Sequence, residues 1–310
     1  MQSVNWRDEL VERLARSPCC GYSRTDAIAS EPSALTALAL AGEGRLDCCE
    51  QVAKWLQGAQ AADGSVAIRE NERVPCWTTS LAVLAWSSLR ETDYDHFALP
   101  TERAIDWIVN ARGVTIPREQ GLGHDSSIVA WPWVDGTHAW VEPTALHVLA
   151  LKAVGLGEHA RTRDAVRMLF DRQVPGGGFN YGNTFVLDRP LRPHLQPTGV
   201  ALLALASETD SRQDIRRSLS YLRNNTSAQT TTTSLCWSLL ALAAHHALPS
   251  DCESWLEISF RRTLQRDQSP LKLALILLAL QGEDSFAVKL HQRPPMIDRI
   301  TIPTRDSHVT

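Results

Sequence analysis

An apolar phrase recurs six times along the chain and constrains the fold more than any other feature. Its plainest copy is residues 141–151, with close copies at residues 31–40 and 196–205 and looser copies that end at residues 86, 242 and 280. A repeat of this size indicates that one supersecondary unit recurs and stacks on its neighbours. Each copy is therefore expected to form the same element of that unit.

Each copy predicts a helix that is buried on all sides. A proline such as Pro143 is expected at the first helical position, where a missing N–H costs nothing. The Ala- and Leu-rich run that follows is apolar all round, which is typical of an inner helix, and is too short to span a bilayer. Residues 49–59 instead carry Val52, Trp55 and Leu56 on one stripe, which predicts a one-sided outer helix.

The outer helices end in a spaced phrase that points to a known family. The phrase is Trp55, Leu56, Gln60, Gly64 and Val66 in one copy, and Met168, Leu169, Gln173, Gly177 and Phe179 in another. This spacing resembles the QW motif of the squalene cyclase and protein prenyltransferase repeat superfamily. The Pro-Thr-Ala-Leu helices and the Gly-rich residues 176–183 look like the same family, over about residues 30–285. The resemblance implies an all-α (α/α)6 toroid, with inner helices ringed by outer ones.

The domain organisation follows from the repeat. We expect a single toroid domain over residues 1–290, with a short N-terminal helical extension at residues 6–15 and no strand region of consequence. Residues 291–310 predict a polar, proline-containing tail. The net charge of −4 argues against a nucleic-acid partner. The charged N-terminal segment favours a cytoplasmic protein, and the scattered or adjacent cysteines favour reduced thiols.

The site is expected at one rim of the ring. In such a ring the N-termini of the inner helices gather at one end and carry partial positive charge. Residues 110–141 and 175–196 are too long for simple turns and end at that rim, which is typical of functional loops. An aromatic wall with a polar mouth would suit a small hydrophobic, isoprenoid-type ligand.

Three ionisable residues are candidates for acid–base catalysis: Asp135, His138 and Glu142. Asp135 is the favoured proton donor, because neighbouring tryptophans would desolvate it while the helix dipole favours the anion at Glu142. His138 would keep Asp135 protonated by hydrogen bonding to it. In the alternative interpretation, Glu142 only caps a helix dipole, as Glu31 is expected to do.

Seven residues are candidates for substrate binding. They are Trp77, Trp131, Trp133, Trp140, Tyr181, Asn183 and His194. Tryptophan faces could stabilise a carbocation by cation–π attraction. The alternative is that the tryptophans wedge the seams between helices.

The chain departs from the family's catalytic signatures. The Asp-x-Asp-Asp motif of class II terpene cyclases is absent, since residues 93–95 (Asp-Tyr-Asp) precede His96; the Asp-x-Cys zinc signature of the prenyltransferases is missing too. The leading hypothesis is a terpene cyclase-like enzyme that starts cyclisation with an acid. The alternatives are a non-catalytic hydrophobic-ligand-binding or scaffold toroid, and a zinc-dependent prenyl transferase with ligands from Cys76, His138 and His194. No metal or other cofactor is expected, because the cysteines lack paired spacing. A peripheral membrane contact and a partner subunit stay open.

Overall fold

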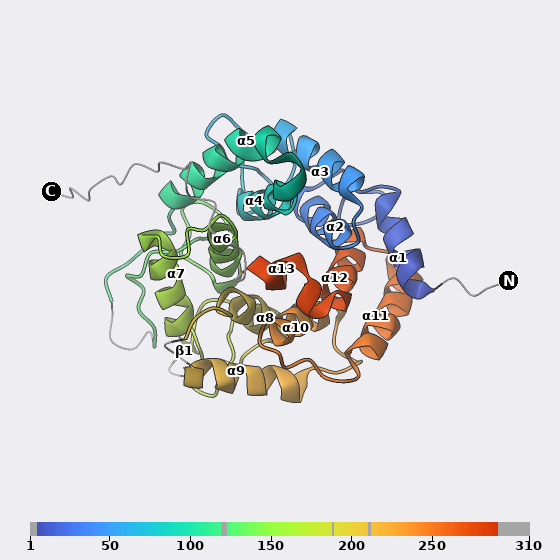
Figure 1. Ribbon diagram of the computed structural model, residues 1–310. Coiled ribbons are helices and arrows are strands. Elements are labelled where there is room, and N and C mark those ends of the chain that lie inside the picture. Colours follow the sequence, from blue (N-terminus) through green and yellow to red (C-terminus); the bar gives the residue numbers. More distant parts are fainter. Residues whose placement is uncertain (1–4, 119–122, 188, 210–211, 291–310) are drawn as a thin grey trace.

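The computed structural model describes residues 5–118, 123–187, 189–209 and 212–290 and is mainly helical there (Figure 1). The main helices are α1 (Trp6–Ala15), α2 (Ser30–Gly42), α3 (Leu46–Gly58), α4 (Thr79–Ser88), α5 (Arg90–Asn110), α6 (Val141–Ala153), α7 (Ala160–Asp171), α8 (Leu195–Ala204), α9 (Arg212–Asn225), α10 (Thr232–Ala244), α11 (Cys252–Arg266) and α12 (Pro270–Leu280). A short hairpin joins β1 (Phe185–Val186) to β2 (Arg189–Pro190). The all-α prediction is confirmed.

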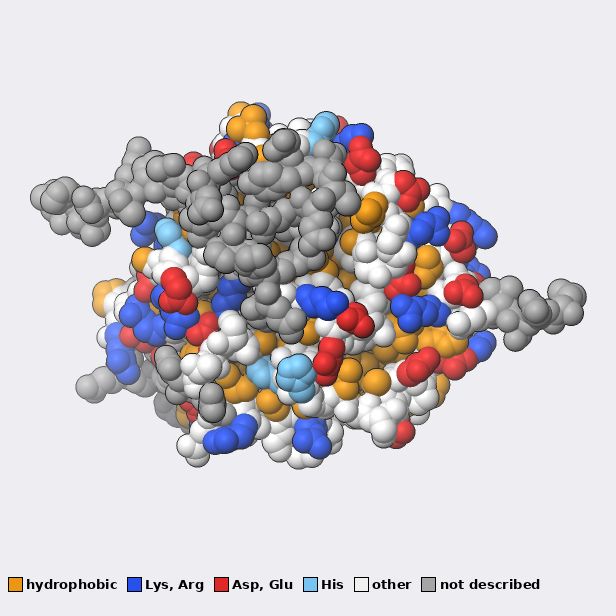
Figure 2. Space-filling view, viewed as in Figure 1, with side chains coloured by type: hydrophobic (Ala, Val, Ile, Leu, Met, Phe, Trp, Pro, Cys, Tyr) orange, Lys and Arg blue, Asp and Glu red, His pale blue; other side chains and the backbone are white. Residues whose placement is uncertain are grey.

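The even-numbered helices form the inner layer of the molecule. Each packs against the next from α2 to α12, and α12 packs against α2, so the inner layer closes into a ring. The odd-numbered helices α1 to α11 lie outside it (Figure 1). Acidic and basic side chains are interspersed over the outer surface (Figure 2). No helix in the described ranges is both long and apolar enough to cross a bilayer.

The prolines lie two residues deeper in the inner helices than the sequence predicted. Pro32, Pro143 and Pro197 are the third residues of α2, α6 and α8, whereas Pro270 does begin α12. The third position tolerates proline, because the first four N–H groups of a helix have no acceptor within it. The residue before each of the first three prolines therefore joins the first helical turn at the rim.

The glutamines of the spaced phrase tie successive outer helices together. Gln60 Nε2 donates to the Pro100 carbonyl of α5 at 2.8 Å. Gln173 Nε2 donates to the Asp214 carbonyl of α9 at 2.7 Å and to Ser218 Oγ at 2.5 Å. The recurring glutamine is thus a structural clamp, which explains its fixed distance from the end of the outer helix.

The glycines of the same phrase allow the next outer helix to approach. Gly64 and Gly177 have φ angles of +94° and +91°, a region that favours glycine. A Cβ atom on Gly64 would lie 2.2 Å from the Arg103 carbonyl oxygen, and one on Gly177 would lie 2.7 Å from the Arg217 carbonyl carbon. A larger residue would push α5 or α9 outward.

A short C-terminal helix covers the ring at the end opposite the rim. It is α13 (Phe286–Lys289), which follows the 3₁₀ turn Gly282–Asp284, packs on α2 and α10, and lies over the middle of the ring (Figure 1). Gln281, which precedes the turn, donates from Nε2 to the Ala39 carbonyl at 2.7 Å and fastens α12 to α2. The tail predicted for residues 291–310 lies outside the described residues.

Candidate functional site

Three polar side chains occupy the same position at the starts of three inner helices. Glu31, Glu142 and Gln196 are the second residues of α2, α6 and α8. Glu142 interacts with both of the others, since the Gln196 side chain favours its anion and the charge of Glu31 disfavours it. The register of the repeat thus brings two carboxyl groups and an amide together at the rim.

Glu142 has the properties of an acid that holds its proton near neutral pH. Its side chain is buried, with 6% of the residue exposed, and Oε1 has no hydrogen-bond partner among the described residues. Burial, reinforced by the charge of Glu31, raises its pKa from 4.5 to about 7, although Gln196 opposes the rise. Desolvation disfavours a carboxylate, so the protonated form persists here. The sequence predicted that the helix dipole, which favours the Glu142 anion, would be the stronger effect. In the structure, burial outweighs the dipole.

Glu31 is the second carboxyl group and is coupled to a tyrosine. Burial raises its pKa, and the Tyr22 hydroxyl opposes that rise. Burial and the charge of Glu31 also raise the pKa of Tyr22, so this phenol stays protonated and can donate a hydrogen bond. From the sequence, Glu31 was expected only to cap a helix dipole. Its identical register to Glu142 in the repeat was the signal that could have identified it.

The polar residues predicted from the loops lie outside this buried cluster. Asp135, His138 and His194 are exposed. The His138 and Trp140 rings are tilted by 33° with centroids 4.6 Å apart, and the His194 and Tyr181 ring centroids are 5.2 Å apart. Asp135 is exposed to water, whereas its choice as the favoured proton donor assumed that neighbouring tryptophans would bury it. Tyr181 is 42% exposed and lies near Glu142, whose charge adds to the effect of burial in raising the tyrosine's pKa.

Trp131 belongs to the core rather than to a ligand wall. It is 1% exposed and stacks on His147 with centroids 4.9 Å apart and planes inclined by 4°. The Arg161 guanidinium lies 4.4 Å from the tryptophan ring centroid, and Trp131 Nε1 donates to the Ile108 carbonyl at 2.9 Å. Burial lowers the pKa of His147 to about 4, so this histidine is neutral. Trp131 therefore fills a seam between helices, as the alternative interpretation predicted.

The other predicted tryptophans lie around an apolar pocket of about 700 Å³ beside the start of α6. Trp133, Trp140 and Asn183 line it, and Trp133 also packs edge-on against Trp77 with centroids 4.8 Å apart. The remaining apolar walls include Val114, Ile116, Ile128, Val134 and Phe185. The pocket is large enough for a small hydrophobic molecule. Glu142 does not line it.

The structure gives no ligand set for the zinc hypothesis. Over the described residues, no three His, Cys, Asp or Glu side chains are arranged to hold a metal ion. The buried Cys76 thiol donates to the Arg73 carbonyl at 3.0 Å, whereas His138 and His194 lie in exposed loops. Cys76, His138 and His194 therefore do not form a common site.

Solved structures with this fold are found, although sequence comparison identifies no relative. No known family model matches the chain, and no curated protein matches it. The apo structure of the type II terpene cyclase MstE from Scytonema matches with a TM-score of 0.59 over 92% of this chain and 99% of that chain, at 10% identity. A variant of MstE in complex with its product, merosterolic acid A, also gives 0.59, over 90% and 97%, at 11% identity. A protein from Actinoplanes gives 0.50 over 86% and 82%, at 13% identity. The chain therefore has a terpene cyclase-like fold.

Proposed function

We propose that the protein is a terpene cyclase-like enzyme that protonates an isoprenoid or other hydrophobic substrate and so starts its cyclisation. Its ring would be the (α/α)6 toroid of the squalene cyclase and prenyltransferase superfamily. The observation that carries the proposal is Glu142, a buried carboxylic acid whose pKa is about 7. The fold shared with MstE supports the same class of reaction, although the similarity itself extends only to the fold.

In the proposed step, Glu142 is the general acid. Its carboxyl O–H donates the proton to one carbon of a substrate alkene, and the π electrons form the new C–H bond. The other alkene carbon becomes a carbocation, which a second double bond of the substrate attacks to close a ring. Loss of a proton ends the reaction, so product and substrate are isomers. Burial, aided by the charge of Glu31, keeps Glu142 protonated, and Gln196 would orient the carboxyl group.

Aromatic residues at the rim would bind the substrate. Trp77, Trp133 and Trp140 could present faces to a carbocation or a hydrocarbon chain, with Tyr181, Asn183 and His194 at the polar mouth. Trp131 is withdrawn from this set, because its faces are occupied by His147 and Arg161. Asp135 and His138 are withdrawn as acids, because both are exposed.

The test is turnover of acyclic isoprenoids in D₂O, followed by mass spectrometry. Proton-initiated cyclisation should give an isomeric product that carries one deuterium on carbon. Glu142→Gln should abolish turnover, and the matched loop variant Asp135→Asn should retain it. Cyclised product from Glu142→Gln, or loss of product from Asp135→Asn alone, would contradict the assignment of the acid.

The second candidate is a non-catalytic hydrophobic-ligand-binding toroid. It is favoured by the pocket of about 700 Å³, which Trp133 and Trp140 line without contribution from Glu142. In that case an isoprenoid would bind without turnover. Wild-type protein and Glu142→Gln would then bind it equally, and Trp133→Ala would weaken binding.

A further inference from the structure

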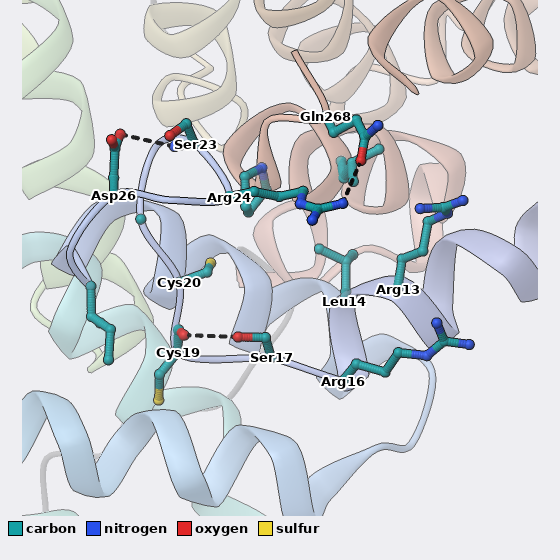
Figure 3. Close-up of a pocket in the computed structure, with 14 residues that line it drawn as sticks. Arg13, Leu14, Arg16, Ser17, Cys19, Cys20, Ser23, Arg24, Asp26 and Gln268 are labelled. Atoms are coloured by element: carbon teal, nitrogen blue, oxygen red, sulfur yellow. Dashed lines mark hydrogen bonds between the residues drawn. The ribbon is translucent and has the colours of Figure 1, made fainter. Parts of the chain in front are cut away.

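A second pocket, separate from Glu142, lies outside the inner ring. Its volume is about 480 Å³, and it lies between α1, residues 16–28 and the start of α12. Arg13 and Arg16 reach it from the end of α1, and Arg24 reaches it from the segment that leads to α2 (Figure 3). The close-up shows the Arg13 and Arg24 side chains near Gln268, whereas the Arg16 side chain extends away from Arg24. Three arginines thus line one pocket on a chain whose net charge is −4.

The guanidinium groups keep most of their capacity to bind an anion. Arg13 pairs with Glu9 at 2.7 Å, but both side chains are more than one-third exposed, so water screens the pair. Arg24 Nη1 donates to the neutral Gln268 Oε1 at 3.2 Å. Arg16 has no ion pair among the described residues. The three arginines therefore leave an excess of positive charge at the pocket, even with Glu9 paired to Arg13 and Asp26 in the lining.

One carboxylate, Asp26, also lines the pocket and offsets part of this positive charge. Its Oδ2 accepts the Ser23 N–H at 3.0 Å, which holds the carboxylate at residues 23–26. The Cys19 and Cys20 thiols also line it, and burial raises the pKa of both, to about 11 for Cys19. Both thiols are therefore neutral at physiological pH.

Apolar side chains line the pocket as well. They are Leu14, Ile28, Pro270 and Leu273, and Leu14 lies beside Arg13 (Figure 3). Pro270 is also the first residue of α12, so the positive end of that helix dipole lies at the pocket. The pocket thus combines cationic and apolar lining residues.

We propose that this pocket binds the phosphate or diphosphate group of a small organic molecule. Guanidinium groups form paired hydrogen bonds with phosphate oxygens, and three of them match an anion with several charged oxygens better than a single carboxylate. The volume exceeds that of an inorganic phosphate, and the apolar lining residues account for an organic portion. The proposal does not depend on catalysis at Glu142, which is not part of the pocket.

The first experiment measures binding of inorganic diphosphate to the full-length protein by titration calorimetry at low salt. Arg16→Ala and Arg24→Ala should each weaken binding about tenfold, as expected when a charge-assisted hydrogen bond is lost. Arg216→Ala is the matched control, because Arg216 is an exposed arginine on α9, away from the pocket. Its affinity should equal that of the wild type. No binding by the wild type, or equal weakening in the control, would overturn the proposal.

Competition then identifies the source of the phosphate. If a prenyl diphosphate or a nucleoside diphosphate displaces inorganic diphosphate at lower concentration, the organic head group is the ligand. If neither improves on the inorganic anion, the site binds free phosphate species, and the organic portion of the proposal is wrong. Glu142→Gln should bind diphosphate as the wild type does. Loss of binding there, in a variant with a normal melting temperature, would place the anion in the ring and overturn the proposal.

Discussion

Glu31 and Glu142 occupy the same register on two inner helices, and the charge of Glu31 adds to burial in raising the pKa of Glu142. The pKa of Glu31 is itself raised by burial. Two carboxyl groups that interact in a buried site titrate as a pair rather than independently. The register of the repeat therefore places two interacting carboxyl groups at one rim of the ring.

The first prediction concerns stability against pH. Because the folded-state pKa of Glu142 is raised from 4.5 to about 7, ionisation of this group destabilises the folded protein. Its contribution is favourable below pH 4.5 and is lost as the pH rises through about 7, by on the order of 3 kcal/mol. Urea titrations should show that the wild type loses stability relative to Glu142→Gln as the pH rises from 4.5 to about 7. A difference that does not vary with pH would refute the burial argument.

The second prediction concerns the pH dependence of turnover. A proton donor must be protonated, so turnover should fall as the pH rises through about 7. Glu31→Gln removes the charge that raises the pKa of Glu142, so the descending limb should move to lower pH. A carbon-13 NMR titration of the Glu142 carboxyl group provides the same measurement without substrate. A limb that stays in place or moves to higher pH would show that the two groups do not interact.

The third prediction concerns the contact between α8 and α10. A Cβ atom on Gly199 would lie 2.6 Å from the carbonyl carbon and oxygen of Trp237, which are backbone atoms. Gly199→Ala should therefore destabilise the protein by about 3 kcal/mol. Gly58→Ala is the matched control, because no atom lies within 4 Å of its added Cβ, and it should be neutral or stabilising by up to about 1 kcal/mol. Equal unfolding midpoints in urea for the two variants would contradict the prediction.

The fourth prediction concerns Arg161, which supports Trp131. Its guanidinium donates to the Val129 and Ala111 carbonyls at 3.1 and 2.9 Å. Arg161→Ala should cost about 2–4 kcal/mol in thermal or urea unfolding, because it removes the stack on Trp131 and both hydrogen bonds.

Two further variants control this experiment. Arg161→Lys should not restore stability, since an ammonium group cannot reproduce the planar fork. Arg167→Ala, on the same helix, should cost less than about 0.5 kcal/mol, because that side chain is 67% exposed and only pairs with Asp164. An Arg161→Ala protein as stable as Arg167→Ala would refute the supporting role.

The fifth prediction concerns the thiols. All seven cysteines are free in the structure. Alkylation of unfolded protein without reductant should therefore give seven adducts by intact mass. Labelling of the folded protein should be slow, because burial raises the pKa of Cys19 to about 11 and that of Cys49 to about 12. Fewer than seven adducts after unfolding would reveal a disulfide.

The sequence predicted the helices well, because their signals are local. The all-round apolar runs gave the inner helices, and residues 6–15 gave α1 with the observed ends. The predicted starts of α2, α6 and α8 were wrong by two residues, because proline is tolerated throughout the first turn and does not mark its first position. Gly199 stands where the closest copies of the repeat have alanine. Glycine is needed there because the backbone of Trp237, in another repeat, leaves no room for a Cβ atom.

The candidate site was only partly predictable, because its long loops are held by distant contacts. Val114 N–H donates to the Thr137 carbonyl at 2.9 Å, and Gly113 N–H donates to the Ala130 carbonyl at 2.8 Å. These bonds leave Asp135 exposed, which no local pattern reveals. Trp131 is buried under Arg161 of α7, 30 positions further along the chain, so its neighbours in sequence could not indicate its role. Glu142 was identified as a candidate, but the balance between burial and the helix dipole required the structure.

The bond from Gln281 to Ala39 joins residues 242 positions apart, and this separation determines when a newly made chain can finish folding. The ribosome makes α2 well before α12. Until α12 is made, the apolar sides of α2 and α10 that it will cover have no partner, and unpaired surfaces of this kind promote aggregation. The ring therefore cannot close before α12 has been synthesised, and ribosome-bound chains that end before residue 270 should depend on chaperones to stay soluble.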